Sequence, residues 1–167
     1  MIVAIDTESL EEHQLSVPDP RAAMIAFNQS LIDEFRANGG QATTGPFAGR
    51  QLMLLTTVGA KSGQTRVSPL AYSRDGDQVI IVASKGGSDS HPAWYLNLVT
   101  NPIVTVEVGP ERYRARAHVA QGAERERLYA QHAELFPNFR DYARKTSRVI
   151  PVIVLERLPD GGAATQG

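Results

Sequence analysis

The feature that most constrains the fold is a series of short apolar segments, each closed by a turn signal. The runs "QLMLLTTV" and "QVIIVAS" are rich in branched residues, and "IVTVEV" alternates apolar and polar positions, as strands do. The Asp-Gly pair in "RDGDQ" (74–78) predicts a hairpin, because it accepts the positive φ angles of a type I′ turn. Gly109 and Pro110 predict a second hairpin, into "ERYRARAHV". Antiparallel pairing therefore dominates the expected sheet.

Helical patterns flank these strands. Asp19 and Pro20 form a start signal, a capping aspartate before a proline at the first helical position. The glycine pair at 39–40 ends this helix. Its apolar residues recur at helical spacing: Met24, Phe27, Leu31 and Phe35. Further helices are expected just after Pro92, over about 121–136 and near 138–145, and a last strand over 150–158.

The expected order is one helix, three strands, a helix, two strands, two helices and a strand. About six antiparallel strands can hide their edges by closing into a small barrel. The predicted class is therefore α+β, mostly antiparallel, with an N-terminal helix and short flanking helices. We expect residues 1–18 to form a loose arm, 19–158 a single domain, and 159–167 a flexible tail.

Composition excludes several classes of function. The net charge of −1 gives no general bias toward nucleic acid, and the absence of cysteine excludes disulfides and thiol catalysis. The four histidines show no ligand spacing, so no metal site is expected. No apolar run approaches the roughly 18 residues of a membrane span, and the acidic start does not resemble a signal peptide. A cytoplasmic protein is the default expectation.

Two short loops carry lysine and glycine at the ends of strands. The loop "GAKSGQTR" offers Lys61, Ser62 and Arg66, a set that suits a phosphate or carboxylate, although a solvated turn explains the same composition. The loop at 84–87 repeats this chemistry at the end of what we expect to be a neighbouring strand. Pro69 inside a strand predicts an edge, where a flat ligand can approach the sheet. Together these features favour one shared anionic ligand.

Aromatic residues supply candidate walls for such a ligand. Trp94 and Leu98 lie four apart on one helix face, which fits either core packing or a wall beside an aromatic ligand. Phe136, Phe139 and Tyr142 lie three apart, with the same two interpretations.

Basic residues alternate along "ERYRARAHV". Their side chains predict either the solvated face of a sheet, with Glu107 pairing across the hairpin, or an electropositive groove. The residues are Arg112, Arg114, Arg116 and His118. From the residues alone, the chain is a small β-barrel with a basic, glycine-bearing pocket for a flat anionic ligand.

Five motifs in this order resemble the deazaflavin-dependent nitroreductase family of actinobacteria: "LLTTVGAKSGQTRVSPL", "VASKGG", "PAWYLNLVTNP", "FPNFRDY" and "IPV". They span about Leu54 to Val152. The resemblance implies a split β-barrel that binds coenzyme F420, an 8-hydroxy-5-deazaflavin with a phosphate and a polyglutamate tail. It implies an oxidoreductase that transfers a hydride from the reduced coenzyme to a quinone or a nitro-type acceptor.

The resemblance also assigns site residues. The catalytic candidates are Tyr142, as a proton donor alongside solvent, and Ser84. The substrate would meet Phe136, Phe139 and Tyr142. The cofactor-binding candidates form four segments: Ala60, Lys61, Ser62 and Arg66 at the tail; Val67, Ser68, Pro69, Leu70 and Ala71 beside the ring; Val82, Ala83, Ser84 and Lys85 at the ring edge; and Ala93, Trp94, Tyr95, Leu96 and Asn97 as a wall.

Departures from the family pattern bear on the acceptor. Members that activate nitroimidazoles carry tyrosine where this chain has Phe136, Phe139 and Ala71, and a basic residue where it has Ala60. A pocket that has lost these hydroxyls favours a quinone over a polar nitroimidazole.

Two other functions stay open at this point, a split-barrel reductase that uses FMN and a non-catalytic carrier of F420. The expected partners are a small-molecule acceptor and neither nucleic acid nor metal. A homodimer and a weak association with the inner face of the membrane also stay open.

Overall fold

The computed structural model describes residues 19–43 and 48–159. The predicted arm at 1–18 and all but the first residue of the predicted tail at 159–167 lie outside the described residues. The elements in chain order are α2 (Pro20–Ala37), β1 (Leu52–Val58), β2 (Thr65–Ala71), β3 (Ser73–Asp75), β4 (Gln78–Val82), the 3₁₀ helix η2 (Lys85–Gly87), α3 (Ala93–Thr100), β5 (Ile103–Val108), β6 (Glu111–Val119), α4 (Gly122–Leu135), α5 (Asn138–Lys145) and β7 (Val152–Arg157). None of the described helices is long and apolar enough to cross a membrane.

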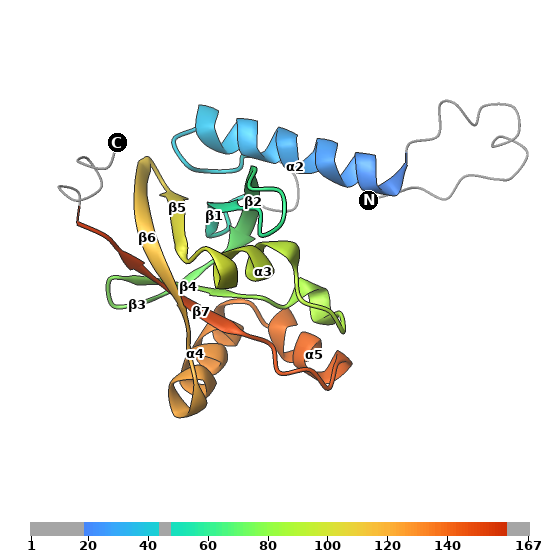
Figure 1. The fold of residues 1–167 in the computed structure, drawn as a ribbon, viewed down its shortest axis with the longest axis vertical. Coiled ribbons are helices and arrows are strands. Elements are labelled where there is room, and N and C mark those ends of the chain that lie inside the picture. Colours follow the sequence, from blue (N-terminus) through green and yellow to red (C-terminus); the bar gives the residue numbers. More distant parts are fainter. Residues whose placement is uncertain (1–18, 44–47, 160–167) are drawn as a thin grey trace, which may run out of the picture.

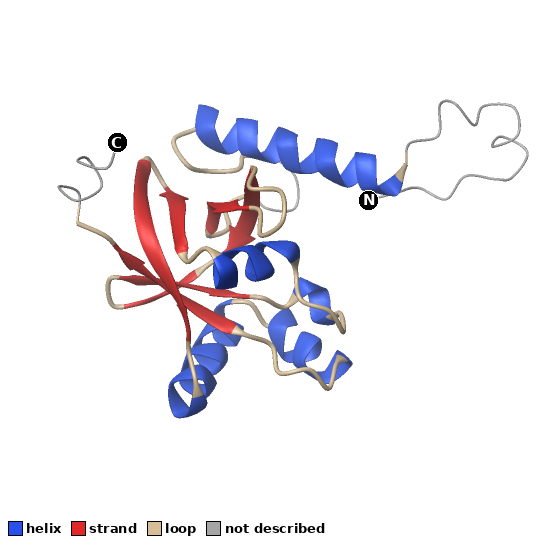
Figure 2. Cartoon of the chain, in the orientation of Figure 1, coloured by secondary structure: helices blue, strands red, loops and turns tan. Residues whose placement is uncertain are grey.

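The strands form one curled sheet (Figure 2). Their order is β2-β1-β5-β6-β7-β4-β3, and every pair of neighbours is antiparallel. The predicted class, a mostly antiparallel α+β fold, is confirmed. The described sheet has seven strands rather than about six, because the expected strand around Pro69 divides at Tyr72. The part before Tyr72 pairs with β1, and the part after it pairs with β4. One residue therefore joins the two end strands of the sheet.

Both faces of β1, β4 and β7 are largely buried, which explains their unbroken apolar runs. In β1, Met53 and Leu55 belong to the core inside the curl, whereas Leu52 and Leu54 pack under α2. The same division by alternation occurs in β4 and β7, whose outer residues pack under α4 and α5. Ile80 and Val154, for example, share a cluster with Leu128 of α4. Figure 1 shows α2 on one side of the sheet and α4 and α5 on the other.

Helix α2 begins as predicted, with Asp19 as its N-cap and Pro20 in its first turn. Only its second half is part of the core. Leu31 and Phe35 are buried, but Met24 is 61% exposed although it shares their helical spacing. The reason is that the first half of α2 extends past the end of the sheet (Figure 1).

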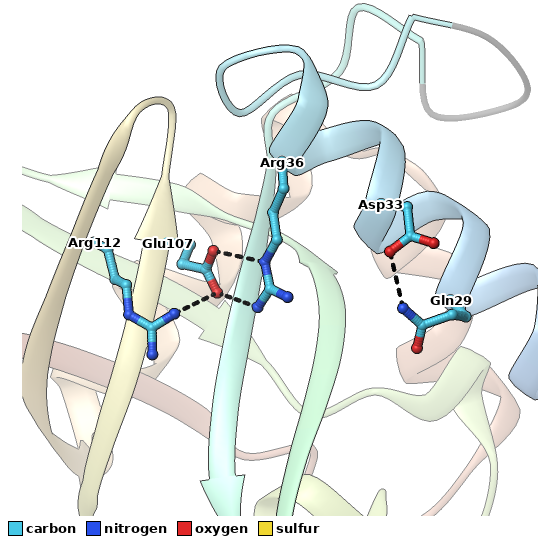
Figure 3. A network of polar contacts seen from close by, with 5 residues as sticks. All are labelled: Gln29, Asp33, Arg36, Glu107 and Arg112. Carbon is cyan, nitrogen blue, oxygen red and sulfur yellow. Dashed lines mark hydrogen bonds and ion pairs between the residues drawn. The ribbon is translucent and has the colours of Figure 1, made fainter.

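A buried carboxylate fixes the position of α2. Glu107 on β5 accepts two hydrogen bonds from Arg36 of α2, 3.0 Å from Nε and 2.8 Å from Nη2 (Figure 3). The predicted pairing across the β5–β6 hairpin is present too, but Arg112 lies farther away, at 3.8 Å. Bidentate geometry makes the contact with Arg36 the stronger one. The helix is thus held to the sheet by one ion pair as well as by its apolar face.

We expect Arg36→Ala to lower the free energy of unfolding by about 1–3 kcal/mol, because it leaves the Glu107 carboxylate, which is only 9% exposed, with Arg112 alone. Urea denaturation measures this change. The control is Gln29→Ala, which removes an exposed hydrogen bond to Asp33 on the same helix (Figure 3) and should change stability by less than about 0.5 kcal/mol. Equal effects of the two substitutions would contradict the assigned role of Glu107.

Candidate functional site

A cavity of about 730 Å³ lies where the two ends of the curled sheet approach each other. One wall comes from β2 and the other from the end of β4 and the start of η2. The segment 136–142 at α5 and the start of α3 complete it. The lining residues are Asn28, Arg50, Gln51, Ser68, Pro69, Leu70, Ala71, Val82, Ser84, Lys85, Gly86, Pro92, Trp94, Phe136, Pro137, Asn138, Phe139 and Tyr142.

The expectation that the loops at 59–66 and 84–87 follow neighbouring strands is wrong. The strands that lead into them, β1 and β4, are not neighbours, since β5, β6 and β7 lie between them in the sheet. The curl of the sheet brings β2 and β4 to the same cavity instead. The prediction from Pro69 is confirmed, because β2 is an end strand that pairs only with β1. Its free edge does not need the N–H that proline lacks.

The wall at η2 has an unusual backbone. Lys85, Gly86 and Gly87 all have positive φ, at 48°, 65° and 85°. A Cβ on Gly87 would lie 2.9 Å from the backbone oxygen of Tyr142, so only glycine allows η2 to approach α5 this closely. The side chain of Ser84, just before this turn, is buried against the cavity. Its hydroxyl has no protein partner among the described residues and is available to a ligand.

Aromatic side chains of the segment 136–142 form the wall next to η2. Phe139 lies 6.1 Å from Phe136 and 5.0 Å from Tyr142 between ring centroids. Core packing is confirmed for this cluster, because Phe139 and Tyr142 pack against the core under α4; both also line the cavity, so their contact with a ligand stays a prediction. The same holds for Trp94, which is 8% exposed and belongs to the inner core. Within the described part of the chain, the Tyr142 hydroxyl has no hydrogen-bond partner.

A buried histidine supports this wall from behind. His132 of α4 is fully buried, and its ring lies 4.6 Å from that of Phe139 and 5.0 Å from that of Phe136. Its Nδ1 is 2.8 Å from the hydroxyl of Ser73, while Nε2 has no partner in the described structure. Burial lowers the pKa of His132 to about 4. The ring is therefore neutral near pH 7.

Ten of the predicted cofactor residues do not line the cavity: Ala60, Lys61, Ser62, Arg66, Val67, Ala83, Ala93, Tyr95, Leu96 and Asn97. The first four lie in or beside the β1–β2 turn, where all four are exposed. The buried amide of Asn97 donates to Thr57 at 3.1 Å and accepts from the backbone of Ala60 at 3.0 Å. Asn97 thus fixes the turn rather than the cavity wall.

Several residues of the site escaped sequence reasoning. Asn28 reaches the cavity because α2 lies over the sheet, and Arg50 precedes β1 beside the end of β2. No local pattern encodes either relation. Asn138 and Pro137 could have been included, since they stand between Phe136 and Phe139. Arg148 was also missed. It lies outside the cavity but donates hydrogen bonds to backbone carbonyl groups of residues 83–88, which we call the β4–η2 segment.

Comparison with known proteins places this geometry in a family. The family described as F420H(2)-dependent quinone reductase matches residues 29–157. The F420H(2)-dependent quinone reductase Rv1261c of Mycobacterium tuberculosis is 45% identical over 108 residues, which are 63% of this chain and 72% of that protein.

Two solved structures are similar as well. One, described as an F420-H2 dependent reductase (FDR-A), is 40% identical with a TM-score of 0.60 and covers 64% of this chain and 95% of its own. The other, described as a domain-swapped dimer, is 34% identical with a TM-score of 0.63 and covers 83% and 100%. The fold of this chain is thus that of the predicted split β-barrel.

The buried histidine predicts an acid-sensitive fold. The unfolded chain takes up a proton at His132 below about pH 6.5, whereas the folded protein resists it down to about pH 4. Stability is therefore full above pH 6.5 and falls as the pH drops toward 4, by up to about 3 kcal/mol from this group. Urea denaturation across this range measures the loss. His132→Phe should remove this part of the slope, and His118→Gln, on the exposed face of β6, should keep it. The interpretation fails if His132→Phe and the parent chain show the same slope.

Proposed function

Because this chain belongs to the F420H(2)-dependent quinone reductase family, we propose that it transfers a hydride from reduced coenzyme F420 to a quinone. The observation that carries the proposal is the cavity between β2 and η2, which combines an apolar aromatic wall with three hydroxyls that have no protein partner among the described residues. Those hydroxyls belong to Ser68, Ser84 and Tyr142. They are the few convergent polar groups that fix a flat ligand in a mostly apolar site.

The cavity fits the ring of the coenzyme in size and shape. A volume of about 730 Å³ lies within the range of cofactor sites, roughly 300–1,000 Å³, and the flat edge of β2 suits a tricyclic ring. In our proposal, 67–71 pass beside the ring, and 82–85 contact its edge through backbone groups and the Ser84 hydroxyl. Trp94 closes the pocket.

The anionic tail requires an exit toward cations. Residue 72 carries the chain from β2 into β3, and β4 runs back antiparallel to β3, so the end of β4 lies on the side of the β1–β2 turn. A tail that leaves the cavity on this side would reach Arg66 and then Lys61 and Ser62. Both cations are exposed, and neither has a protein partner among the described residues. Asn97 acts indirectly in this proposal, because it holds the turn in place.

Bound reduced F420 supplies the hydride from C5 of its ring, so the protein needs no catalytic triad. The side chains hold the two reactants together and exclude water from between them. Reduction of a quinone to a hydroquinone requires a hydride and one proton. We assign delivery of the proton to the Tyr142 hydroxyl or to water beside it. We assign Ser84 to the ring edge, where it would orient the cofactor for the transfer.

The aromatic wall favours a quinone as acceptor. Phe136, Phe139 and Ala71 line the cavity without hydroxyls, so a flat, weakly solvated acceptor loses fewer hydrogen bonds there than a polar nitroimidazole.

We propose a homodimer in addition, because a similar chain is described as a domain-swapped dimer and Met24 and Ile25 of α2 are each 61% exposed. This favours a second copy of the chain over a membrane surface as the partner of α2.

The first test is a fluorescence titration with reduced F420 and with FMN, followed by turnover with a panel of quinones. We expect the deazaflavin to bind more tightly than FMN and the bound reduced form to be oxidised by a naphthoquinone. Tighter binding of FMN would favour the flavin alternative. Tight binding of F420 without oxidation by any quinone would favour the carrier.

A second test addresses the proton. Tyr142→Phe keeps the ring and removes the hydroxyl, and turnover of the quinone should fall about tenfold or more while the cofactor still binds. The matched control is Tyr113→Phe, since Tyr113 is half-buried on β6 but does not line this cavity. Unchanged turnover in Tyr142→Phe would leave that residue a packing role only.

A third test addresses the tail. Lys61→Ala and Arg66→Ala should each weaken binding of the full coenzyme about tenfold, through loss of a charge-assisted hydrogen bond worth about 1.5 kcal/mol. High salt should reduce the difference, because screening already weakens binding by the parent chain. A tail-free deazaflavin should bind both variants like the parent chain. Arg116→Ala, an exposed change on β6, is the control, and a similar loss there would rule out a local tail site.

A further inference from the structure

We propose that Arg148 is a positioning residue that holds the β4–η2 segment in the shape required to bind the cofactor, an inference that rests on the proposed function. Arg148 lies between α5 and β7 and does not line the cavity. Its guanidinium nevertheless directs all its hydrogen bonds to the segment 83–91, part of which forms one wall of the cavity.

The contacts of this guanidinium are numerous and short. Nη2 donates to the carbonyl oxygens of Ser84 at 2.9 Å and Ser88 at 2.7 Å. Nε donates to Ser88 at 3.0 Å, and Nη1 donates to the carbonyl of Ala83 at 3.2 Å. Nη1 also lies 3.0 Å from Nδ1 of His91. The planar fork of five N–H groups therefore meets three carbonyls and one ring nitrogen, a pattern that lysine cannot reproduce.

Further contacts join the residues around Arg148 to the segment 83–91. Thr146 accepts a hydrogen bond from the backbone N–H of Arg148 at 3.1 Å, and its hydroxyl donates to Asp89 at 2.7 Å. Gly87 packs directly against the backbone of Tyr142 in α5. The β4–η2 segment is thus held on one side by α5 and by the residues that follow it.

The backbone of this segment explains why such support is needed. Lys85 adopts a φ of 48°, which is unfavourable for a residue other than glycine, and two glycines with positive φ follow it. A strained conformation persists only where surrounding contacts determine it. The carbonyls that Arg148 binds flank this turn on both sides, at Ser84 and Ser88. The guanidinium therefore fixes the backbone from which Ser84 and Lys85 line the cavity.

This role makes a quantitative prediction. Without the guanidinium, the segment samples other conformations, and the apparent dissociation constant rises in inverse proportion to the fraction of molecules that keep the competent one. We expect Arg148→Ala to weaken binding of the full and the tail-free deazaflavin alike, by about tenfold. The turnover number at saturating cofactor should stay within about twofold of that of the parent chain, because Arg148 contacts neither reactant. Guanidinium ion added at millimolar concentration should restore part of the affinity.

The experiment compares Arg148→Ala, Arg148→Lys and the control Arg140→Ala, an exposed arginine on α5. Amide hydrogen exchange in the cofactor-free proteins should rise in 83–88 for both Arg148 variants, more for alanine, and nowhere in the control. Exchange that rises evenly over the whole chain would make Arg148 an ordinary stabilising residue and overturn the proposal, as would unchanged affinity for the deazaflavin. If the parent chain binds no deazaflavin, the proposed function fails. The exchange pattern then decides separately whether Arg148 orders this segment.

Discussion

The single residue between β2 and β3 is the constraint on which the rest of the fold depends. These two strands stand at opposite ends of the sheet order, yet only Tyr72 separates them in the chain. A flat seven-stranded sheet would place its end strands roughly 29 Å apart, about six spacings of 4.8 Å, and one residue spans at most about 3.6 Å. The sheet must therefore curl until its ends meet. The inner core, the buried outer faces under the helices and the position of the cavity all follow from this closure.

The site combines polar groups that are already bonded with polar groups that are not. Asn97 and Arg148 use their donors within the protein, the first to hold the β1–β2 turn and the second to hold the β4–η2 segment. The hydroxyls of Ser84 and Tyr142 face the cavity without a protein partner among the described residues. Such an arrangement orders the walls before a ligand arrives, so less conformational entropy is lost on binding.

Local signals made most of the elements predictable. The hairpin at 74–78, the cap at Asp19 and the glycine pair after α2 each depend on a few adjacent residues, and the structure confirms them. The type I′ turn expected in this hairpin was wrong, because it requires two residues with positive φ and only Gly76 has one there. Non-local relations were not predictable in this way. The sequence around Glu107 indicated its neighbour across the hairpin but not Arg36, because 71 residues separate the two. The contacts of Arg148 were not predictable for the same reason, since more than 60 residues separate it from Ala83 and Ser84. The aromatic residues at 136–142 were predictable because their spacing and motif are local.

The way the cavity is assembled also has a consequence for the order of folding. Its walls come from positions near 70, 84 and 140, so their contacts require the closure of long loops, in contrast to the adjacent pairing of β1 with β2 or β5 with β6. Long-range closure is the slow part of folding in sheet proteins. Hairpins can thus form while the chain still lacks any place for a ligand. Binding competence would appear late along the folding pathway, after β7 has joined β6 to β4.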